Sequence, residues 1–135
     1  MRARSIVTAG YMPLDVITHD DAIVHQAGGT AANVAAILAY LGWKATLAGQ
    51  TGDDNAGQIL IDDLRSVGVD VAQIHRPTGM STPRVVHHIR PGGHFFAYRC
   101  PTCGRALPRS RPLTVDQARI CAHDNPRPDV YFFDR

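Results

Sequence analysis

Apolar residues occur along the first part of the chain in short runs that end at glycine or proline. The run at residues 5–11, SIVTAGY, is apolar and β-branched and is followed by Pro13, which predicts a buried first strand. Residues 22–26, AIVHQ, predict a second short strand, and residues 44–52, KATLAGQTG, predict the next.

Two stretches between these runs space their apolar residues by three and four positions, as on one face of a helix. The first covers residues 31 to about 41, with Thr30 as the candidate N-cap and Gly42 as the C-terminal stop. The second covers residues 54–67 and ends before Gly68. The alternation of strands and helices predicts an α/β protein with a mostly parallel sheet. The positions expected on the buried faces are Val34, Ile37, Leu38 and Leu41, then Ile59, Leu60, Leu64 and Val67.

The alternation changes at about residue 73, where two strand-like runs are joined by the turn sequence RPGGH. This predicts an antiparallel hairpin over about residues 73–99, of the kind that forms an insertion or a lid. One face of the hairpin needs cover from a ligand, the core or a second subunit, and we favour a homodimer formed through it. Its apolar residues are Val85, Val86, Ile89, Phe95, Phe96 and Tyr98.

A loop at about residues 100–112 leads to the last two predicted elements. The run TVDQARICAHD has a capping threonine and a helical pattern, and PDVYFFDR is an apolar strand. The sequence stops on that strand without a helix to cover it, so we expect the chain to be the N-terminal portion of a larger single domain. Val130, Phe132 and Phe133 are then expected to be incompletely covered.

The composition of the chain, with 135 residues of which 44% are hydrophobic, predicts one globular domain. No apolar run approaches the roughly 20 residues of a membrane span, and the start lacks the apolar core of a signal peptide. We therefore expect a cytoplasmic protein, with neither a membrane nor a nucleic acid as partner. Residues 71–115 contain seven arginines and no acidic residue, which indicates either a surface for an anionic ligand or, as we favour, a solvated loop.

The three cysteines, two of them in the sequence CPTC, indicate reduced thiols or a metal site rather than a disulfide framework. Cys100 and Cys103 resemble one half of a tetrahedral Zn²⁺ site, whose other ligands would come from Cys121 and His123 or from His94. Cys121 and His123 are two positions apart in a predicted helix and therefore point in different directions. The alternatives are a loop without metal, which we favour, and a redox pair, which normally opens a helix.

The residues from His25 to Gly57, HQAGGTAANVAAILAYLGWKATLAGQTGDDNAG, place glycines at both ends of the first predicted helix and again after the next strand. They match every fixed position of the first signature of the ribokinase-like (PfkB) carbohydrate kinases, and the chain resembles the N-terminal part of that family. The segments GDDNAG and GYMPLDVI resemble the family as well, with Asp15 assigned to the first strand. The signature positions are Gly28, Gly29, Ala31, Asn33, Ala35, Gly42 and Gly52.

This resemblance implies a Rossmann-like three-layer α/β fold of the ribokinase type, incomplete in this chain, with a small β-hairpin lid. Gly52 and Asp53 would shape a turn beside a pocket for a sugar or nucleoside. The residue types suit polyols, because glycines expose the backbone at a helix start, asparagine donates and accepts, and an ionised aspartate accepts. The residues that would line the pocket are Asp15, Gly28, Gly29 and Asn33.

The implied activity is transfer of the γ-phosphoryl group of ATP, with Mg²⁺, to a substrate hydroxyl. The family's base and anion hole belong to a second motif that this sequence lacks, so no catalytic residue is assigned and residues 1–135 alone are expected to be inactive. ATP is expected to bind mainly outside this chain. GGTAANVA is neither a dinucleotide-binding nor a P-loop motif. The alternative is a non-catalytic module that binds a sugar or is stabilised by zinc.

Overall fold

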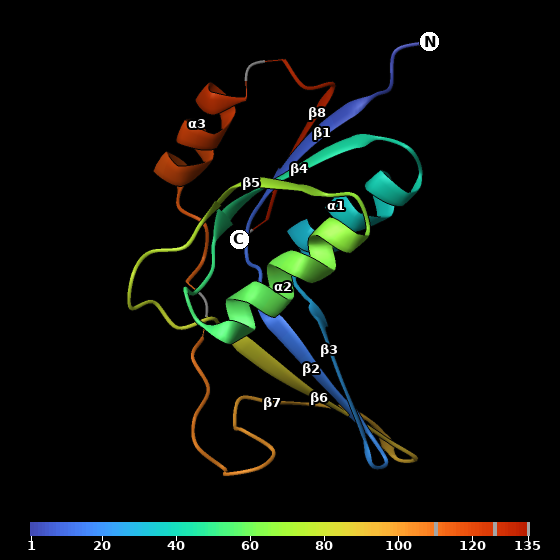
Figure 1. Cartoon of the computed structure of the whole chain (residues 1–135), viewed down its shortest axis with the longest axis vertical. Helices are drawn as coiled ribbons and strands as arrows, with labels where there is room; N and C mark the ends of the chain where they lie inside the picture. The colour runs from blue at the N-terminus through green and yellow to red at the C-terminus, as the bar shows by residue number, and fades with distance from the viewer. Residues whose placement is uncertain (110, 126, 135) are drawn as a thin grey trace.

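The computed structural model describes residues 1–109, 111–125 and 127–134 and arranges them around two β-sheets. The first sheet is parallel throughout and has the strand order β5-β4-β1-β8 (Figure 1). Parallel neighbours need crossover connections, and helices provide them here, which confirms the strand–helix alternation predicted from the sequence. The strands are β1 (Ser5–Ala9), β4 (Lys44–Gln50), β5 (Asp70–His75) and β8 (Val130–Phe133).

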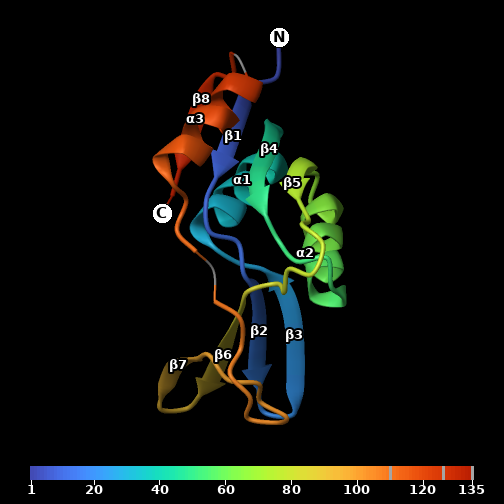
Figure 2. The same cartoon turned by 90° about the vertical axis from the view of Figure 1, so that its left-hand side faces the viewer.

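Helices lie on both faces of the parallel sheet and produce the expected three layers. α1 (Thr30–Tyr40) and α2 (Asn55–Ser66) share one apolar core with the sheet. α3 (Val115–Asp124) lies on the opposite side, where Cys121 packs against β1 and β4 (Figure 2). Alternating side chains of β1 serve both cores, since Ile6 faces α1 and α2 whereas Val7 faces α3. No helix within the described residues is long and apolar enough to cross a membrane.

The first helix buries its alanines rather than the larger residues that the spacing predicted. Ala31, Ala32 and Ala35 are at most 1% exposed, whereas Ile37 and Leu41 are 59% and 63% exposed. Small side chains allow α1 to lie close against the sheet, and larger ones in their place would hold the helix away from it. Of the four residues predicted on the buried face, Val34 and Leu38 are partly buried against the core, whereas Ile37 and Leu41 are exposed.

The second helix is amphipathic as predicted, but the buried face is shifted. Leu60, Ile61 and Leu64 are buried, while Val67, which the pattern placed on the same face, is the C-cap and is 43% exposed. Because α2 packs against strands of both sheets, it buries a wider face than a helix on a single sheet needs.

The second sheet extends from one end of the parallel sheet and has the order β3-β2-β6-β7 (Figures 1 and 2). β2 pairs with β3 in an antiparallel manner and with β6 in parallel. β6 and β7 form the antiparallel hairpin that the RPGGH turn predicted. The strands of this second sheet are β2 (Leu14–His19), β3 (Ala22–Ala27), β6 (Arg84–Arg90) and β7 (Gly93–Ala97).

Two assignments made from the sequence in this region are wrong. Residues 14–19 form a strand that the apolar pattern did not reveal, so Asp15 lies in the second sheet and not on the first strand. Gln73 lies in β5 of the parallel sheet, so the hairpin strands begin at Arg84 rather than at about residue 73. Both errors arise because short strands with alternating polar residues give a weak pattern.

The last strand, β8, forms an edge of the parallel sheet beside β1. Val130, Tyr131 and Phe133 are 40%, 37% and 42% exposed. Asp129 fixes the start of the strand by accepting hydrogen bonds from the backbone N and the hydroxyl of Ser5 at 2.7 and 3.0 Å. These bonds, with a smaller effect of Arg2, hold the pKa of Asp129 below its ordinary value.

Candidate functional site

Two glycines form the start of α1, where it meets the segment that links the two sheets. Gly29 is the N-cap, with φ of +90°, and gives the first helical turn no side-chain hydrogen bond. Thr30 is the first helical residue, so its predicted role as N-cap is wrong, because a branched side chain disfavours a positive φ. A Cβ at position 29 would collide with the backbone oxygen of Tyr11. The helix start therefore has no capping side chain for its first N–H groups.

Asp15 on β2 lies against the first of these glycines. Its carboxylate occupies the place where a Cβ of residue 28 would be, so this close approach requires Gly28. The Asp15 side chain is 13% exposed, and its Oδ1 lies 3.2 Å from Nε2 of His87, which is 15% exposed. Burial raises the pKa of Asp15, and the charge and contact of His87 oppose that rise.

A second histidine extends this contact onto β7. Nδ1 of His87 lies 2.9 Å from Nε2 of His94. Phe96 packs on both imidazoles, with ring centroids 5.0 Å from His87 and 4.6 Å from His94. His87 is not among the site residues predicted from the sequence, where His94 appears only as an alternative zinc ligand. The available signal is the strand sequence VVHHIR, in which alternation places His87 and His88 on opposite faces.

Asn33 lies in the first turn of α1 and is exposed. Its backbone N donates to the oxygen of Gly29 at 3.0 Å, which closes the first turn of the helix. Its side chain forms no hydrogen bond with the described residues. The structure thus joins Asp15 directly to Gly28 and places Asn33 near the same helix start, with its amide unengaged.

Gly52 and Asp53 lie in a turn that fastens the loop at residues 76–83 to the start of α2. The backbone N of Gly52 donates to Oγ1 of Thr82 at 3.1 Å, and a Cβ on Gly52 would collide with the backbone N of Thr82. The carboxylate of Asp53 accepts from the backbone N of Gly79 at 2.9 Å. Both predicted turn residues are therefore engaged with the protein backbone.

The next aspartate, Asp54, is satisfied entirely by neighbouring groups. It is the N-cap of α2 and accepts from the backbone N of Gly57 at 3.0 Å and of Thr82 at 3.1 Å. Nη2 of Arg84 lies 3.7 Å away. Burial acts to raise the pKa of Asp54, but the hydrogen bonds from Thr82 and Gly57, together with the charge of Arg84, outweigh it, so the pKa is lowered.

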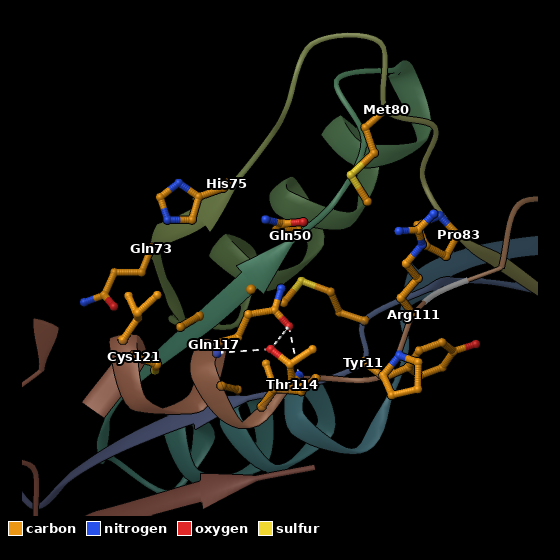
Figure 3. A pocket seen from close by; sticks show the side chains of 18 of the residues that line it. Tyr11, Gln50, Gln73, His75, Met80, Pro83, Arg111, Thr114, Gln117 and Cys121 are labelled. Atoms are coloured by element: carbon orange, nitrogen blue, oxygen red, sulfur yellow. Dashed lines mark hydrogen bonds between the residues drawn. The ribbon is translucent and has the colours of Figure 1, made fainter. Parts of the chain in front are cut away.

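A cavity of about 690 Å³ lies between the ends of β1, β4 and β5 and the segment that leads into α3 (Figure 3). Gln50 and His75 line it from the strand ends, and Gln117 lines it from α3. Thr114 and Gln117 form the capping box of that helix, in which the Gln117 backbone donates to Thr114 Oγ1 at 3.2 Å. The cavity lining does not include the four predicted pocket residues, Asp15, Gly28, Gly29 and Asn33.

The arginines of residues 71–115 serve different purposes. Arg76 donates to the oxygen of Gly52 at 2.9 Å and to Gln58 Oε1 at 2.7 Å, so it stabilises the turn before α2. Arg109 and Arg111 both line the cavity. The stretch is therefore not a uniformly solvated loop.

The cysteine loop gives no support to the predicted zinc site. In the part of the chain that the structure describes, no three His, Cys or Asp side chains are grouped so that they could hold a metal ion. Cys121 is buried against the parallel sheet, and His94 contacts His87. Cys100 and Cys103 are free thiols, and backbone hydrogen bonds from Cys103 and Thr102 lower the pKa of Cys100.

Comparison with known proteins identifies relatives of this arrangement. A sequence profile described as pfkB family carbohydrate kinase matches residues 3–101. Fructokinase-1 of Oryza sativa subsp. japonica is 32% identical over 116 residues, which are 78% of this chain and 36% of the relative. Probable fructokinase-4 of Arabidopsis thaliana is 35% identical over 94 residues, or 68% of this chain and 28% of the relative. The chain thus spans about a third of the length of these relatives.

Solved structures of sugar kinases and PfkB proteins are similar to this chain in fold. An uncharacterized sugar kinase from Pyrococcus horikoshii in complex with ATP has a TM-score of 0.62 and 26% identity, over 68% of this chain and 33% of that one. A PfkB protein from a Polaromonas species has a TM-score of 0.65 and 23% identity, over 78% of this chain and 37% of that one. The second likeness shows the fold alone, which is of the ribokinase type.

Proposed function

Because this chain belongs to the pfkB family of carbohydrate kinases, we propose that it forms the acceptor-binding part of an ATP-dependent sugar or nucleoside kinase. The observation that carries the proposal is the contact of the Asp15 carboxylate with Gly28, beside the uncapped start of α1. The buried carboxylate of Asp15, the glycine backbone beside it and the N–H groups at the start of α1 together suit a polyhydroxylated ligand.

The chemistry assigned to these residues is the orientation of an acceptor hydroxyl. An ionised Asp15 accepts a hydrogen bond from the ligand, and the exposed amide of Asn33 both donates and accepts. Holding the hydroxyl in place supplies part of the catalysis of phosphoryl transfer, which depends mainly on positioning and charge stabilisation. Gly52 and Asp53 act at a distance from the ligand, by fixing the loop that borders the cavity.

ATP and Mg²⁺ are the cofactors of the proposed reaction, which transfers the γ-phosphoryl group. The related sugar kinase from Pyrococcus horikoshii was solved in complex with ATP. The present chain offers neither a P-loop sequence nor a cluster of metal ligands among its described residues. We therefore assign the nucleotide mainly to other parts of the kinase, and we expect residues 1–135 alone to transfer no phosphate.

The proposal extends to the assembly of the protein. Ile23, Phe95 and Phe96 of the second sheet are 53%, 51% and 62% exposed, which leaves apolar surface on its strands. A homodimer formed through this sheet would cover that surface. Cytoplasmic location remains a prediction from the sequence.

Substitution of the predicted ligand contacts tests the proposed function. In the full-length protein, Asp15→Ala and Asn33→Ala should each weaken the use of the preferred sugar or nucleoside by about 1 to 3 kcal/mol, the cost of an unpaired polar group. Asp21→Ala, in the exposed turn between β2 and β3, is the matched control and should change nothing. Steady-state kinetics over a panel of sugars and nucleosides gives the answer. Equal kinetics in all three variants would remove Asp15 and Asn33 from the site.

A further inference from the structure

The carboxylate of Asp15 is the first member of an array that crosses three strands of the second sheet. Asp15 on β2 stands opposite Val85 on β6, and His87 follows two residues later on the same face. Phe96 on β7 stands opposite His87. The array runs from Asp15 Oδ1 to His87 Nε2 over 3.2 Å and from His87 Nδ1 to His94 Nε2 over 2.9 Å.

The hydrogen atoms of this array are constrained by its geometry. A hydrogen on Nε2 of His87 is needed to stabilise the Asp15 carboxylate, and in a neutral imidazole Nδ1 must then be an acceptor. Nε2 of His94 carries the hydrogen that Nδ1 accepts.

The surroundings of His87 leave it little freedom to do anything else. Its Nε2 atom is buried and has no other hydrogen-bond partner among the described residues, and the Asp15 carboxylate, 3.2 Å away but outside good hydrogen-bond geometry, is the charged group that faces it. His94 and Phe96 from β7 enclose the remainder of the ring, with centroids 5.1 and 5.0 Å away. On the other side of the carboxylate, Gly28 closes the space. Asp15 is therefore clamped between a glycine backbone and a fixed imidazole.

We propose that His87 is a positioning residue for Asp15, which engages Oδ1 and leaves Oδ2 to accept a hydrogen bond from the ligand, while His94 determines which nitrogen of His87 carries the hydrogen. This inference rests on the proposed function, because it assigns a ligand to Asp15. It adds a requirement on the second sheet: the ligand contact depends on β6 and β7 being in place beside β2. The hairpin then contributes to binding through a side chain that does not touch the ligand.

The electrostatics of Asp15 agree with this role. Burial raises its pKa, which favours the protonated acid, and His87 opposes that change. A protonated carboxyl group would donate where the ionised group accepts, so loss of His87 would change the hydrogen bonding offered to the ligand.

Three substitutions in the full-length protein test the positioning role by kinetics. His87→Leu removes the donor and should raise the acceptor KM about tenfold with a smaller change in kcat, since a tenfold change corresponds to one lost hydrogen bond of ordinary strength. His87→Gln supplies an amide N–H and should restore most of the affinity. His88→Leu is the control, because His88 lies on the opposite face of β6, where its Nδ1 is 2.8 Å from Thr18 Oγ1. Equal KM values for His87→Leu and His88→Leu overturn the proposal.

A spectroscopic measurement tests the array without any assay of activity. Nitrogen NMR of the imidazoles in the full-length protein near pH 8 should find the His87 hydrogen on Nε2 and the His94 hydrogen on its own Nε2. His94→Phe keeps a ring beside Phe96 and should shift the Nδ1 signal of His87. A hydrogen found on Nδ1 of neutral His87 overturns the proposal, and this outcome is available even if His87→Leu fails to fold.

The two tests separate this inference from the proposed function. If Asp15→Ala raises the acceptor KM while His87→Leu does not, only the positioning role fails. If Asp15→Ala leaves KM unchanged, the acceptor site itself is wrong, and the positioning role fails with it.

Discussion

Asp54 and Asp15 both lie close to glycine, but their surroundings differ in kind. Asp54 receives two backbone hydrogen bonds, a hydroxyl group and an arginine, and it joins α2 to the loop that follows β5. Asp15 faces one imidazole and the backbone of Gly28. Accordingly the pKa of Asp54 is lowered and that of Asp15 is raised. A carboxylate whose hydrogen-bond acceptors are all used by the protein stabilises the fold. A carboxylate with unused acceptors is available to a ligand.

The largest effect expected from this comparison concerns the two glycines. Gly52→Ala should lower the free energy of unfolding by about 3 kcal/mol, because the new Cβ meets backbone atoms, among them the oxygen of Met80 at 2.7 Å. Gly28→Ala should cost less, about 1 to 2 kcal/mol, because the atoms that its Cβ meets belong to the Asp15 side chain, which must leave its place beside His87 to make room. Urea unfolding of both variants measures the difference.

Gly92→Ala serves as the control for these two variants, since a Cβ there has open space. For the same loss of stability, Gly28→Ala should weaken ligand binding more than Gly52→Ala does, because Gly28→Ala displaces Asp15. Equal destabilisation by Gly28→Ala and Gly52→Ala would remove the distinction between the two aspartate environments.

Removal of the satisfied carboxylate should produce the next largest effect. Asp54→Ala should lower the free energy of unfolding at pH 7 by about 1 to 2 kcal/mol, through loss of the helix cap and the bonds to Thr82. The pKa of Asp54 is lower in the folded state, so its contribution is present above the unfolded pKa of about 3.9 and is lost as the pH falls through the folded value. The wild type and variant should therefore converge in unfolding experiments below about pH 4. A constant difference across that range would contradict the assignment.

Removal of the Asp15 charge should change the free energy of unfolding at pH 7 in the opposite direction, and by a smaller amount. Its pKa is raised on folding, so the stability that it contributes is complete below the unfolded pKa and falls as the pH rises through the folded value. At pH 7, Asp15→Asn should therefore be as stable as the wild type or more stable, with a free energy of unfolding up to about 1 kcal/mol higher. Thermal unfolding at pH 4 and pH 7 gives the sign, and marked destabilisation at pH 7 would show that Asp15 is structural.

The smallest effect on stability belongs to the hairpin surface. Phe95→Ser should change the unfolding free energy of the monomer by no more than about 0.5 kcal/mol, because its side chain is 51% exposed. Sedimentation of the same variant tests the proposed homodimer. Retention of a dimer would place its interface elsewhere.

Much of the parallel core could be predicted from the sequence, because helices and strands with one apolar face carry a strong period. β1, β4 and α2 lie close to their expected positions. β2 was not predicted, since Asp15 and the exposed end of the strand interrupt its apolar run. The burial of alanines in α1 depends on how closely the helix approaches the sheet, which the spacing of large residues does not reveal.

The candidate site was predictable in part. The glycine pattern indicated Gly28 and Gly29, and the structure adds the reasons that both positions need glycine. His87 could not be inferred, because its contact with Asp15 depends on the parallel pairing of β2 with β6, strands that are far apart in the sequence. The turn at Gly52 and Asp53 was predicted from the resemblance to the family, whereas its attachment to Thr82 is a tertiary contact.

The position of β8 beside β1 has a consequence for the order in which the chain folds. β1 can pair with β4 after a loop of moderate length, whereas the contacts between Ser5 and Asp129 close a loop of 124 residues. Long loops close at a greater entropic cost, and contacts of this range form late in folding. We expect β4 to dock on β1 first and β8 to be the last strand of the parallel sheet to gain protection from amide hydrogen exchange during refolding.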